Sequence, residues 1–245
     1  MRSITLTAFA LIGCVATPAV AKDTELFILG ALHGLHEQEE SFGFGELERV
    51  IEAIKPEVLM LEVTPEELAG KLETKGRPEY PKVIWPMLGR LQAKAYAMEV
   101  AQPLYGELTG DAGARWGEFK KRLPADDAAL TAHSAATSNV LQAYWKSVAD
   151  TQDQATDALG RARVQLSGAM AAGTDPVQVR WDSAMVESVK SAIAENPGKR
   201  VLVLGSYRNR YMFADELRGV SGTKLIDMQE WLEAKGFGRR PAASR

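Results

Sequence analysis

A histidine and a glutamate each stand where an apolar run of the chain ends. His33 follows the apolar segment 26–30, and Glu62 lies near the end of the apolar segment 58–63. Imidazole is a common general base and metal ligand, and a carboxylate in apolar surroundings needs a partner for its charge. The carboxyl ends of parallel strands gather at one edge of a sheet. We therefore expect His33 and Glu62, delivered by adjacent strands, to face one cleft.

A second strand end offers positive charge. The segment Gly205-Ser206-Tyr207-Arg208 follows the apolar strand 201–204, just as Gly30-Ala31-Leu32-His33 follows the first strand. Arg208 and Arg210 precede a predicted helix. Their guanidinium groups, together with the free backbone N–H groups of the helix start, could therefore hold an anion.

Another pair of charges begins a later helix, in the segment Arg180-Trp181-Asp182. Asp182 stands in the predicted first turn, where the helix dipole favours an acid, and Arg180 could bind a carboxylate through two hydrogen bonds. An internal ion network that joins the arginines to Glu62 and Asp182 accounts for the same residues without a ligand. Both interpretations stay open at this point.

A metal site in the first loop is a further alternative. His33 and His36 lie three residues apart and Glu37 follows them, so two imidazoles could meet on one helical turn and bind a transition metal. The loop lacks the His-Glu-x-x-His arrangement of zinc peptidases, and exposed loop residues explain the pattern equally well. His133 has no motif around it and receives no role.

The elements that position these residues follow from hydrophobic spacing and from glycine and proline. Between the first two strands, apolar residues at positions 47, 50, 51 and 54 recur at helical spacing until Pro56 ends the helix. Thr64-Pro65-Glu66-Glu67 is a capping box that opens a new helix directly after Glu62. The composition of segment 75–81 indicates a linker. Five further predicted elements complete the pattern: a helix from 179 to 195, the strand 201–204, a helix near 212–218, a strand at 224–227 and a helix at 229–235.

This alternation predicts an α/β fold, with a mostly parallel sheet and helices on both of its faces. The alanine-rich, strand-poor stretch from about 110 to 175 predicts an all-helical insertion. Residues 22–235 then form a single domain, and residues 236–245 a flexible basic tail.

The first 21 residues predict a cleaved signal peptide. Met1-Arg2 is a basic start, residues 4–15 are apolar, and Ala19-Val20-Ala21 offers the small residues that a signal peptidase accepts. This predicts a secreted or periplasmic protein. Alternatively, Leu11-Ile12-Gly13-Cys14 resembles a lipoprotein cleavage site, which would keep the chain on a membrane through Cys14.

Composition excludes several classes of protein. Cys14 is the only cysteine, so no disulfide and no thiolate metal site is expected in the mature chain. The net charge of -3 gives no sign of a nucleic-acid binder. No segment after the leader is long and apolar enough to predict a transmembrane helix. A small molecule or a peptide is the expected substrate or ligand.

In the order and setting of these short motifs, the chain resembles the TraB, GumN and Tiki superfamily, which also includes the ChaN-like and erythromycin-esterase-like proteins. Its Gly30-Ala31-Leu32-His33 is similar to the first Gly-x-x-His motif of that superfamily, and Glu62 to its acidic strand end. The segment 180–185 is similar to its Arg/Asp helix, and Gly205-Ser206-Tyr207-Arg208 to its second Gly-x-x-His motif. The resemblance covers about 25–63 and 179–227 and leaves the middle of the chain unmatched.

The resemblance implies a hydrolase, since Tiki-like members are metal-dependent proteases. It gives His33 and Glu62 catalytic or metal-binding roles, with a divalent transition metal as the implied cofactor. In the second motif Arg208 replaces the histidine, and a protonated arginine cannot ligate a metal. We expect Arg180 and Arg208 to orient an anionic group or oxyanion, and we count Asp182, the acid of the first helical turn, with them among the catalytic residues. The alternative function is a non-catalytic binding protein for an anionic small molecule or for haem, as ChaN-like relatives suggest.

Overall fold

The protein was analysed as a computed structural model that describes residues 22–171 and 176–239. The predicted signal peptide and Cys14 lie outside the described residues, so the predictions about them stay predictions. The described residues form a sheet of five parallel strands: β1 Thr24–Ala31, β2 Val58–Leu61, β3 Lys94–Ala97, β4 Arg200–Ser206 and β5 Thr223–Leu225.

Strand β4 lies in the middle of the sheet, and the strand order is β3-β2-β4-β1-β5. Its residues pair in parallel with β1 on one side and with β2 on the other. His33 and Glu62 therefore do not come from adjacent strands, and that part of the prediction is wrong. The sequence order of the strands hides this arrangement, because the last long strand is inserted between the first two.

Nine helices surround the sheet in the described part of the chain. They are α1 Phe44–Ile54, α2 Pro65–Gly70, α3 Trp85–Leu91, α4 Leu104–Arg122, α5 Pro124–Tyr144, α6 Gln154–Met170, α7 Pro176–Glu195, α8 Arg210–Leu217 and α9 Met228–Ala234. Short helical turns, all within the described residues, follow β1 at His33–Glu37 and Glu40–Phe42, precede α3 at Tyr80–Ile84, and precede α6 at Ala149–Gln152. The prediction of an α/β fold with a parallel sheet is confirmed.

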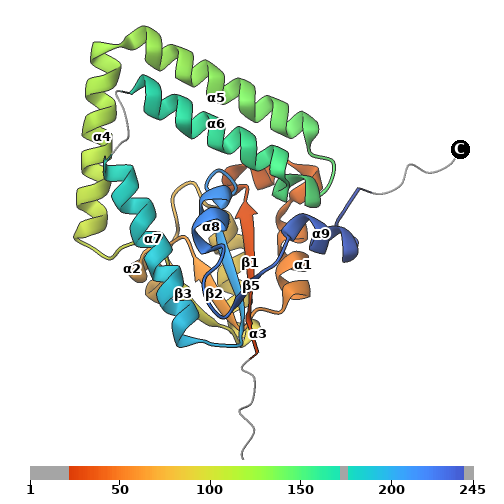
Figure 1. The fold of residues 1–245 in the computed structure, drawn as a ribbon. Coiled ribbons are helices and arrows are strands. Elements are labelled where there is room, and N and C mark those ends of the chain that lie inside the picture. The colour runs from red at the N-terminus through yellow and green to blue at the C-terminus, as the bar shows by residue number, and fades with distance from the viewer. Residues whose placement is uncertain (1–21, 172–175, 240–245) are drawn as a thin grey trace, which may run out of the picture.

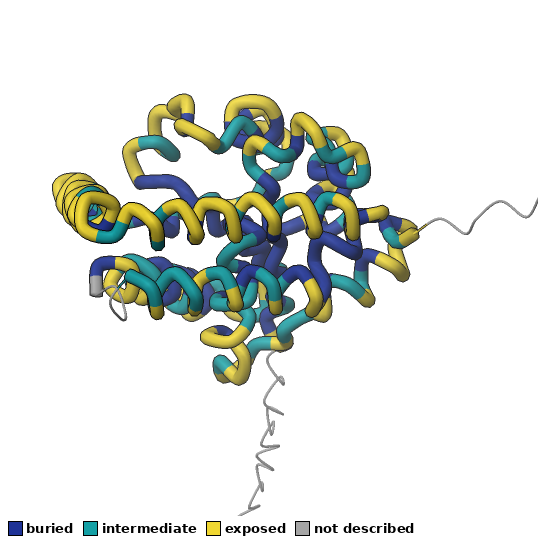
Figure 2. The backbone as a smooth tube through the Cα atoms, turned by 90° about the horizontal axis from the view of Figure 1, so that it is seen from above, coloured by how far each residue is buried: buried dark blue, intermediate teal, exposed yellow. Residues whose placement is uncertain are grey.

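Helices cover both faces of the sheet. Helices α1, α3 and α9 pack on the face that includes Leu29, Leu61 and Leu204, whereas α7 and α8 pack on the face that includes Ile28 and Met60. Figure 2 shows the buried segments gathered in the middle of the molecule, with exposed helices around them. Alternate residues of each strand therefore enter different cores, as expected for a sheet buried on both sides.

Helices α4, α5 and α6 form the helical part between β3 and α7, and the structure places no strand within residues 104–170. Figure 1 shows α5 and α6 running side by side beyond the end toward which the arrow of β1 points. The carboxyl edge of the sheet therefore faces these helices. Among the helices of the described residues, none has the length and apolar character needed to cross a bilayer.

The packed part of the chain extends beyond the predicted end of the domain. Phe237 is buried, and its backbone N–H donates to the carbonyl oxygen of Leu232. Arg239 forms an ion pair of 2.9 Å with Asp150. Residues 237 and 239 thus contact the folded part of the chain, and the prediction of a flexible tail from residue 236 stays a prediction. Residues 240–245 lie outside the described residues.

Candidate functional site

Two strand ends lie side by side at the carboxyl edge of the sheet. In the register of β1 and β4, Gly30 is opposite Gly205 and Ala31 is opposite Ser206. The backbone N–H of Tyr207 donates to the carbonyl oxygen of Ala31 over 3.0 Å, which continues the pairing by one step. His33 and Arg208 thus stand two residues beyond matched positions of adjacent strands.

Gly30 and Gly205 are each needed at their position for a different physical reason. A side-chain carbon on Gly30 would lie 2.6 Å from the Cα atom of Tyr207, so only glycine permits this approach of the two backbones. A side-chain carbon on Gly205 would lie 3.3 Å from Oε2 of Glu62 and 3.2 Å from the ring of Phe213. The second glycine therefore leaves room for the Glu62 carboxylate beside β4.

His33 pairs with a buried glutamate that the sequence analysis did not select. Its Nδ1 lies 2.6 Å from Oε1 of Glu79, and the Glu79 side chain is 0% exposed, compared with 20% for His33. A carboxylate only accepts, so Nδ1–H must be the donor, and this leaves Nε2 of His33 as the free nitrogen. The other Glu79 oxygen, Oε2, is buried without a hydrogen-bond partner. The pair therefore has the geometry of a carboxylate-oriented base.

The backbone of His33 is in the left-handed region, with a φ of 54°. This conformation is uncommon for residues other than glycine, and such outliers occur often at functional sites. It turns the chain sharply at the end of β1 and starts the short helix His33–Glu37. The turn that carries the imidazole is thus held in a conformation that only the surrounding contacts can fix.

His36 is one of those contacts and not a metal ligand. The N–H of Leu32 donates to Nε2 of His36 over 2.9 Å, and Nδ1–H donates to the carbonyl oxygen of Phe42 over 2.6 Å. Burial lowers the pKa of His36, although the Phe42 carbonyl acts in the opposite direction. Glu37 is exposed and pairs with Lys82 at 2.5 Å. Both ring nitrogens of His36 are thus engaged, so this geometry does not fit a metal site formed by His33, His36 and Glu37.

A side-chain amide holds the end of β1 from the other side. Gln152 accepts from the N–H of Gly30 over 2.7 Å and donates to the Gly30 carbonyl oxygen over 3.0 Å. Strand β5 pairs only with residues 24–26 of β1, so this glycine has no strand neighbour there. Gln152 is buried and follows α5, so the helical part of the chain helps to fix the turn that carries His33.

Glu62 belongs to a buried ion network. One of its oxygens accepts from the backbone N–H of Ser206 over 2.5 Å, and the other lies 3.2 Å from a guanidinium nitrogen of Arg77. The same nitrogen of Arg77 lies 3.1 Å from Glu99, and another donates to the backbone carbonyl oxygen of Glu62. The carboxylate of Glu62 therefore joins β2, β4 and the segment that contains Arg77.

The environment of this network shifts several pKa values. Burial raises the pKa of Glu99, and Arg77 partly opposes the shift. For Arg77 burial alone would lower the pKa, but the charges of Glu62, Tyr80 and Glu99 raise it on balance. Trp181 donates its Nε1–H to the other oxygen of Glu99. Every charged group of the network thus has a partner, as buried charges require.

The two clusters are linked through the segment 77–80. Arg77 is fixed by Glu62 and Glu99, and two residues later Glu79 pairs with His33. Burial raises the pKa of Tyr80 well above its ordinary value, and the charges of Glu62 and Glu79 raise it further. Among the described residues no hydrogen bond joins His33 to Glu62. They lie at the same edge of the sheet, but each has its own partner.

The remaining predicted site residues do not join either cluster directly. Asp182 accepts a hydrogen bond of 2.7 Å from Gln178, and its pKa is raised mainly by burial and also by the charge of Glu62. Arg180 is exposed and forms no ion pair with the described residues. Arg210 is buried against Asp157 at 2.6 Å, so it is not available for an anion. Of Arg180, Arg208 and Arg210, only Arg208 is half-buried and has no acidic partner among the described residues.

The donor set does not fit the implied transition metal. His33 offers one free nitrogen, and the Glu62 carboxylate is shared between Arg77 and a backbone N–H. Across residues 22–171 and 176–239 no group of three or more His, Cys, Asp or Glu side chains is arranged to hold a metal ion. A guanidinium beside Glu62 also repels a cation. We therefore assign no step of the chemistry to a metal.

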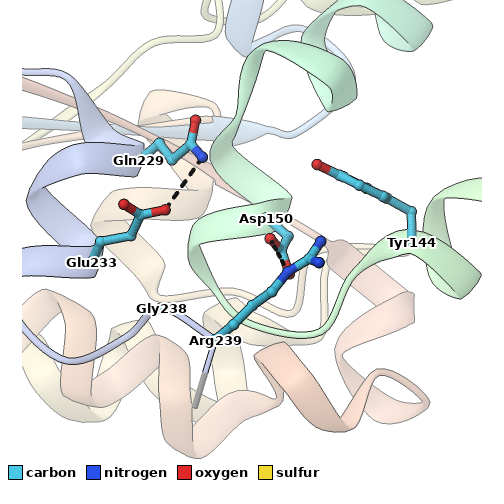
Figure 3. A pocket seen from close by; sticks show the side chains of 6 residues that line it. All are labelled: Tyr144, Asp150, Gln229, Glu233, Gly238 and Arg239. Atoms are coloured by element: carbon cyan, nitrogen blue, oxygen red, sulfur yellow. Dashed lines mark hydrogen bonds and ion pairs between the residues drawn. The ribbon is translucent and has the colours of Figure 1, made fainter. Parts of the chain in front are cut away.

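Two hollows of the described surface are compared as candidate substrate sites. One, of about 700 Å³, lies between the turn after β1 and the segment that carries Glu79; its lining includes Gly34, Glu73, Thr74, Pro78 and Lys82. The other, of about 570 Å³, is shown in Figure 3, and its lining residues are Tyr144, Asp150, Gln229, Glu233, Gly238 and Arg239. In the second hollow Arg239 pairs with Asp150 and Gln229 with Glu233. We select the first because its lining includes Gly34 and Pro78, the sequence neighbours of His33 and Glu79.

The sequence analysis missed Arg77 and Glu79 because their segment has the composition of a linker. The available signal was the alternation of charged, aromatic and proline residues in Arg77-Pro78-Glu79-Tyr80-Pro81, which is unusual for an exposed loop. Glu99 gave a similar signal, since it follows the end of β3 as Glu62 follows the end of β2. Compared with family models, curated proteins and solved structures, the chain gives no match.

Proposed function

We propose that this protein is a hydrolase of the TraB, GumN and Tiki type in which His33 acts as a general base. The observation that supports this most strongly is the contact of 2.6 Å between His33 and the fully buried Glu79. The buried carboxylate fixes the imidazole with Nε2 free, as a base requires. The adjoining hollow of about 700 Å³ offers space for a substrate beside this turn.

In the proposed reaction, Nε2 of His33 takes a proton from a water molecule while the water oxygen attacks an electrophilic carbonyl or phosphoryl centre. The imidazolium that forms is stabilised by the negative charge of Glu79 on Nδ1–H. The unpaired Oε2 of Glu79 strengthens this effect, because no other donor reduces its charge. The proton then passes from Nε2 to the leaving group.

Glu62 is a positioning residue in this proposal. It fixes Arg77, and Arg77 fixes the segment that delivers Glu79 to His33. Asp182 and Arg180 have no part in the proton transfer. This differs from the roles that the sequence alone favours, in which Glu62 is an acid, a base or a ligand.

The test is hydrolysis of a panel of peptide, carboxylic ester and phosphoester substrates by wild-type protein and by the variants His33→Asn and Glu79→Gln. Asparagine tolerates the left-handed backbone, so His33→Asn should keep the fold. Loss of a general base lowers kcat by about 10²–10⁴-fold, and Glu79→Gln should lower kcat while leaving KM nearly unchanged.

His133→Asn is the matched control, because His133 is exposed on α5 and outside the site. It should leave turnover unchanged. Hydrolysis by His33→Asn at the wild-type rate would exclude His33 as the base. If the wild type hydrolyses no member of the panel, the result favours the competing function, a binding protein for an anionic small molecule or haem.

A further inference from the structure

Two arginines in the described part of the chain are exceptional in their surroundings. Six arginines there are at least partly buried, namely Arg77, Arg161, Arg163, Arg200, Arg208 and Arg210. Four of them form ion pairs with carboxylates. Arg163 and Arg208 form none within the described residues. A guanidinium that is partly removed from water normally has an acidic partner, so this pair needs an explanation.

Arg208 is held by the residue before it. Its Nε donates to the hydroxyl oxygen of Tyr207 over 3.2 Å, and its guanidinium lies 5.5 Å from the centre of the Tyr207 ring. Tyr207 is itself buried and packs edge-on against Trp145, with ring centres 5.5 Å apart. The guanidinium is therefore oriented by a neutral group, and its remaining N–H donors need other acceptors.

Helix α6 brings Arg163 to the same place. A side-chain carbon on Gly160 would lie 3.2 Å from the backbone oxygen of Arg208, so this face of α6 packs closely on the turn after β4. Arg163 is three residues later and shares this face. Its pKa is lowered by burial and then by the charge of Arg208. The two guanidinium groups thus repel each other, and within the described residues no carboxylate offsets the repulsion.

We propose that Arg163 and Arg208 form a binding site for the oxyanion group of a small molecule, either a carboxylate or a phosphate. Two planar guanidinium groups match the geometry of such an anion, which would remove the repulsion between them. The hydrogen bond to the Tyr207 hydroxyl fixes the orientation of one of the two guanidinium groups, that of Arg208. Arg210, the first residue of α8, is excluded from this site because Asp157 already binds it.

The site also narrows the substrate class of the proposed hydrolase, and in this respect it rests on the proposed function. Arg208 and His33 each lie two residues beyond the matched pair Ser206 and Ala31 of adjacent strands. Adjacent strands lie about 4.8 Å apart, so the two strand ends are neighbours, and we infer that a substrate bound near His33 extends to the anion site at Arg208. The preferred substrate is then an ester, amide or phosphoester that carries a separate negative group.

The test uses inorganic phosphate and acetate as probes at low ionic strength, with the full protein. Binding is followed through the Nε–H signals of the arginine side chains in ¹⁵N NMR spectra, assigned from the variants Arg163→Gln and Arg208→Gln. Each variant should weaken phosphate binding about tenfold or more, since each removes a charge-assisted contact. Arg161→Gln is the matched control because Arg161 lies on the same helix but pairs with Asp215.

Two results would overturn the proposal. One is that phosphate and acetate leave the Arg163 and Arg208 signals of the wild type unchanged. The other is that Arg161→Gln weakens binding as much as Arg163→Gln does, which would indicate a general charge effect. His33→Asn should bind phosphate as the wild type does. The phosphate-binding test is therefore independent of the hydrolysis test. Failure of the proposed hydrolase activity does not decide whether the anion site exists.

Discussion

The ends of β1 and β4 are matched in register but have different chemical surroundings. Each strand has a glycine as its next-to-last residue, and three residues after the glycine stands a side chain that carries nitrogen donors, His33 or Arg208. At the first end a wholly buried acid, Glu79, pairs with the imidazole. At the second end no described acid pairs with the guanidinium, and α6, the helix that carries Arg163, packs on the backbone of Arg208 instead.

This difference shows that the chemistry of a strand end depends on the segment that packs against it. The imidazole is oriented because the segment 77–80 brings in a carboxylate from outside the sheet. The guanidinium stays available because α6 brings in a second cation. One end is thus suited to proton transfer and the other to binding of an anion.

The largest expected effect concerns the network that holds the segment 77–80. Arg77→Met would leave Glu62 and Glu99 buried without their cation, which should lower the free energy of unfolding by about 3–5 kcal/mol. The measurement is equilibrium denaturation by urea. If the variant is too unstable to purify, Glu99→Gln offers a milder test of the same network.

Arg49→Met is the control for this prediction, because the ion pair of Arg49 with Glu46 is largely exposed. It should change the free energy of unfolding by at most about 1 kcal/mol. Equal effects of Arg77→Met and Arg49→Met would show that the Glu62 network does not fix the segment that carries Glu79. The contrast between the two strand ends would then lose its structural cause.

The next largest effect is the loss of stability on alanine substitution, which should differ between Gly30 and Gly205. Gly30→Ala places a carbon 2.6 Å from the backbone of Tyr207, so the two strands must separate, at a loss of about 1–3 kcal/mol. Gly205→Ala meets only side-chain atoms of Phe213 and Glu62 and should destabilise the protein less. Thermal unfolding of both variants and of Gly34→Ala, which has open space, checks this order. A larger effect of Gly205→Ala would contradict it.

The smallest effect is a pH dependence that arises from His36 at the β1 end. The folded-state pKa of His36 is lowered by burial, so the unfolded chain binds a proton more readily there. Stability from neutral His36 is therefore fully present above the ordinary value of 6.5 and is lost as the pH falls toward the folded pKa.

The variant His36→Gln cannot titrate at this position, so its stability deficit relative to the wild type should shrink between pH 8 and pH 5. The difference between the variant and the wild type is needed because titration of Asp157 changes the stability of both proteins in the opposite direction. Burial raises the pKa of Asp157 to about 6, against the charge of Arg210, and its contribution falls as the pH rises toward that value. A deficit that stays constant over this range would mean that His36 is not held in its neutral form.

Local features of the sequence predict much of the fold. Strands β1, β2 and β4 appear as short apolar runs, and the capping box after β2 is present as predicted, with Thr64 and Glu67 bonding each other's backbone N–H groups. Such features depend on neighbours in the sequence, so spacing alone is enough to identify them. The position of β4 between β1 and β2 is a property of the whole chain, and the local pattern does not contain it.

The site was only partly predictable for the same reason. His33, Glu62 and Arg208 were selected because they follow strands, and the structure places all three at the carboxyl edge. Their partners Glu79 and Arg163 come from a segment with linker composition and from a polar helix. Burial of Glu79 results from long-range contacts of its neighbours, which composition does not show.

The most direct test of the central claim is the protonation of the His33 ring, measured by ¹⁵N NMR of histidine-labelled protein above neutral pH. The spectra of His33→Asn assign the His33 signals, and exposed His133 serves as the reference. Our account predicts a proton on Nδ1, bound to Glu79, and an unprotonated Nε2. A His33 ring with its proton on Nε2 would contradict it, because the nitrogen assigned to proton transfer would then be unable to accept one.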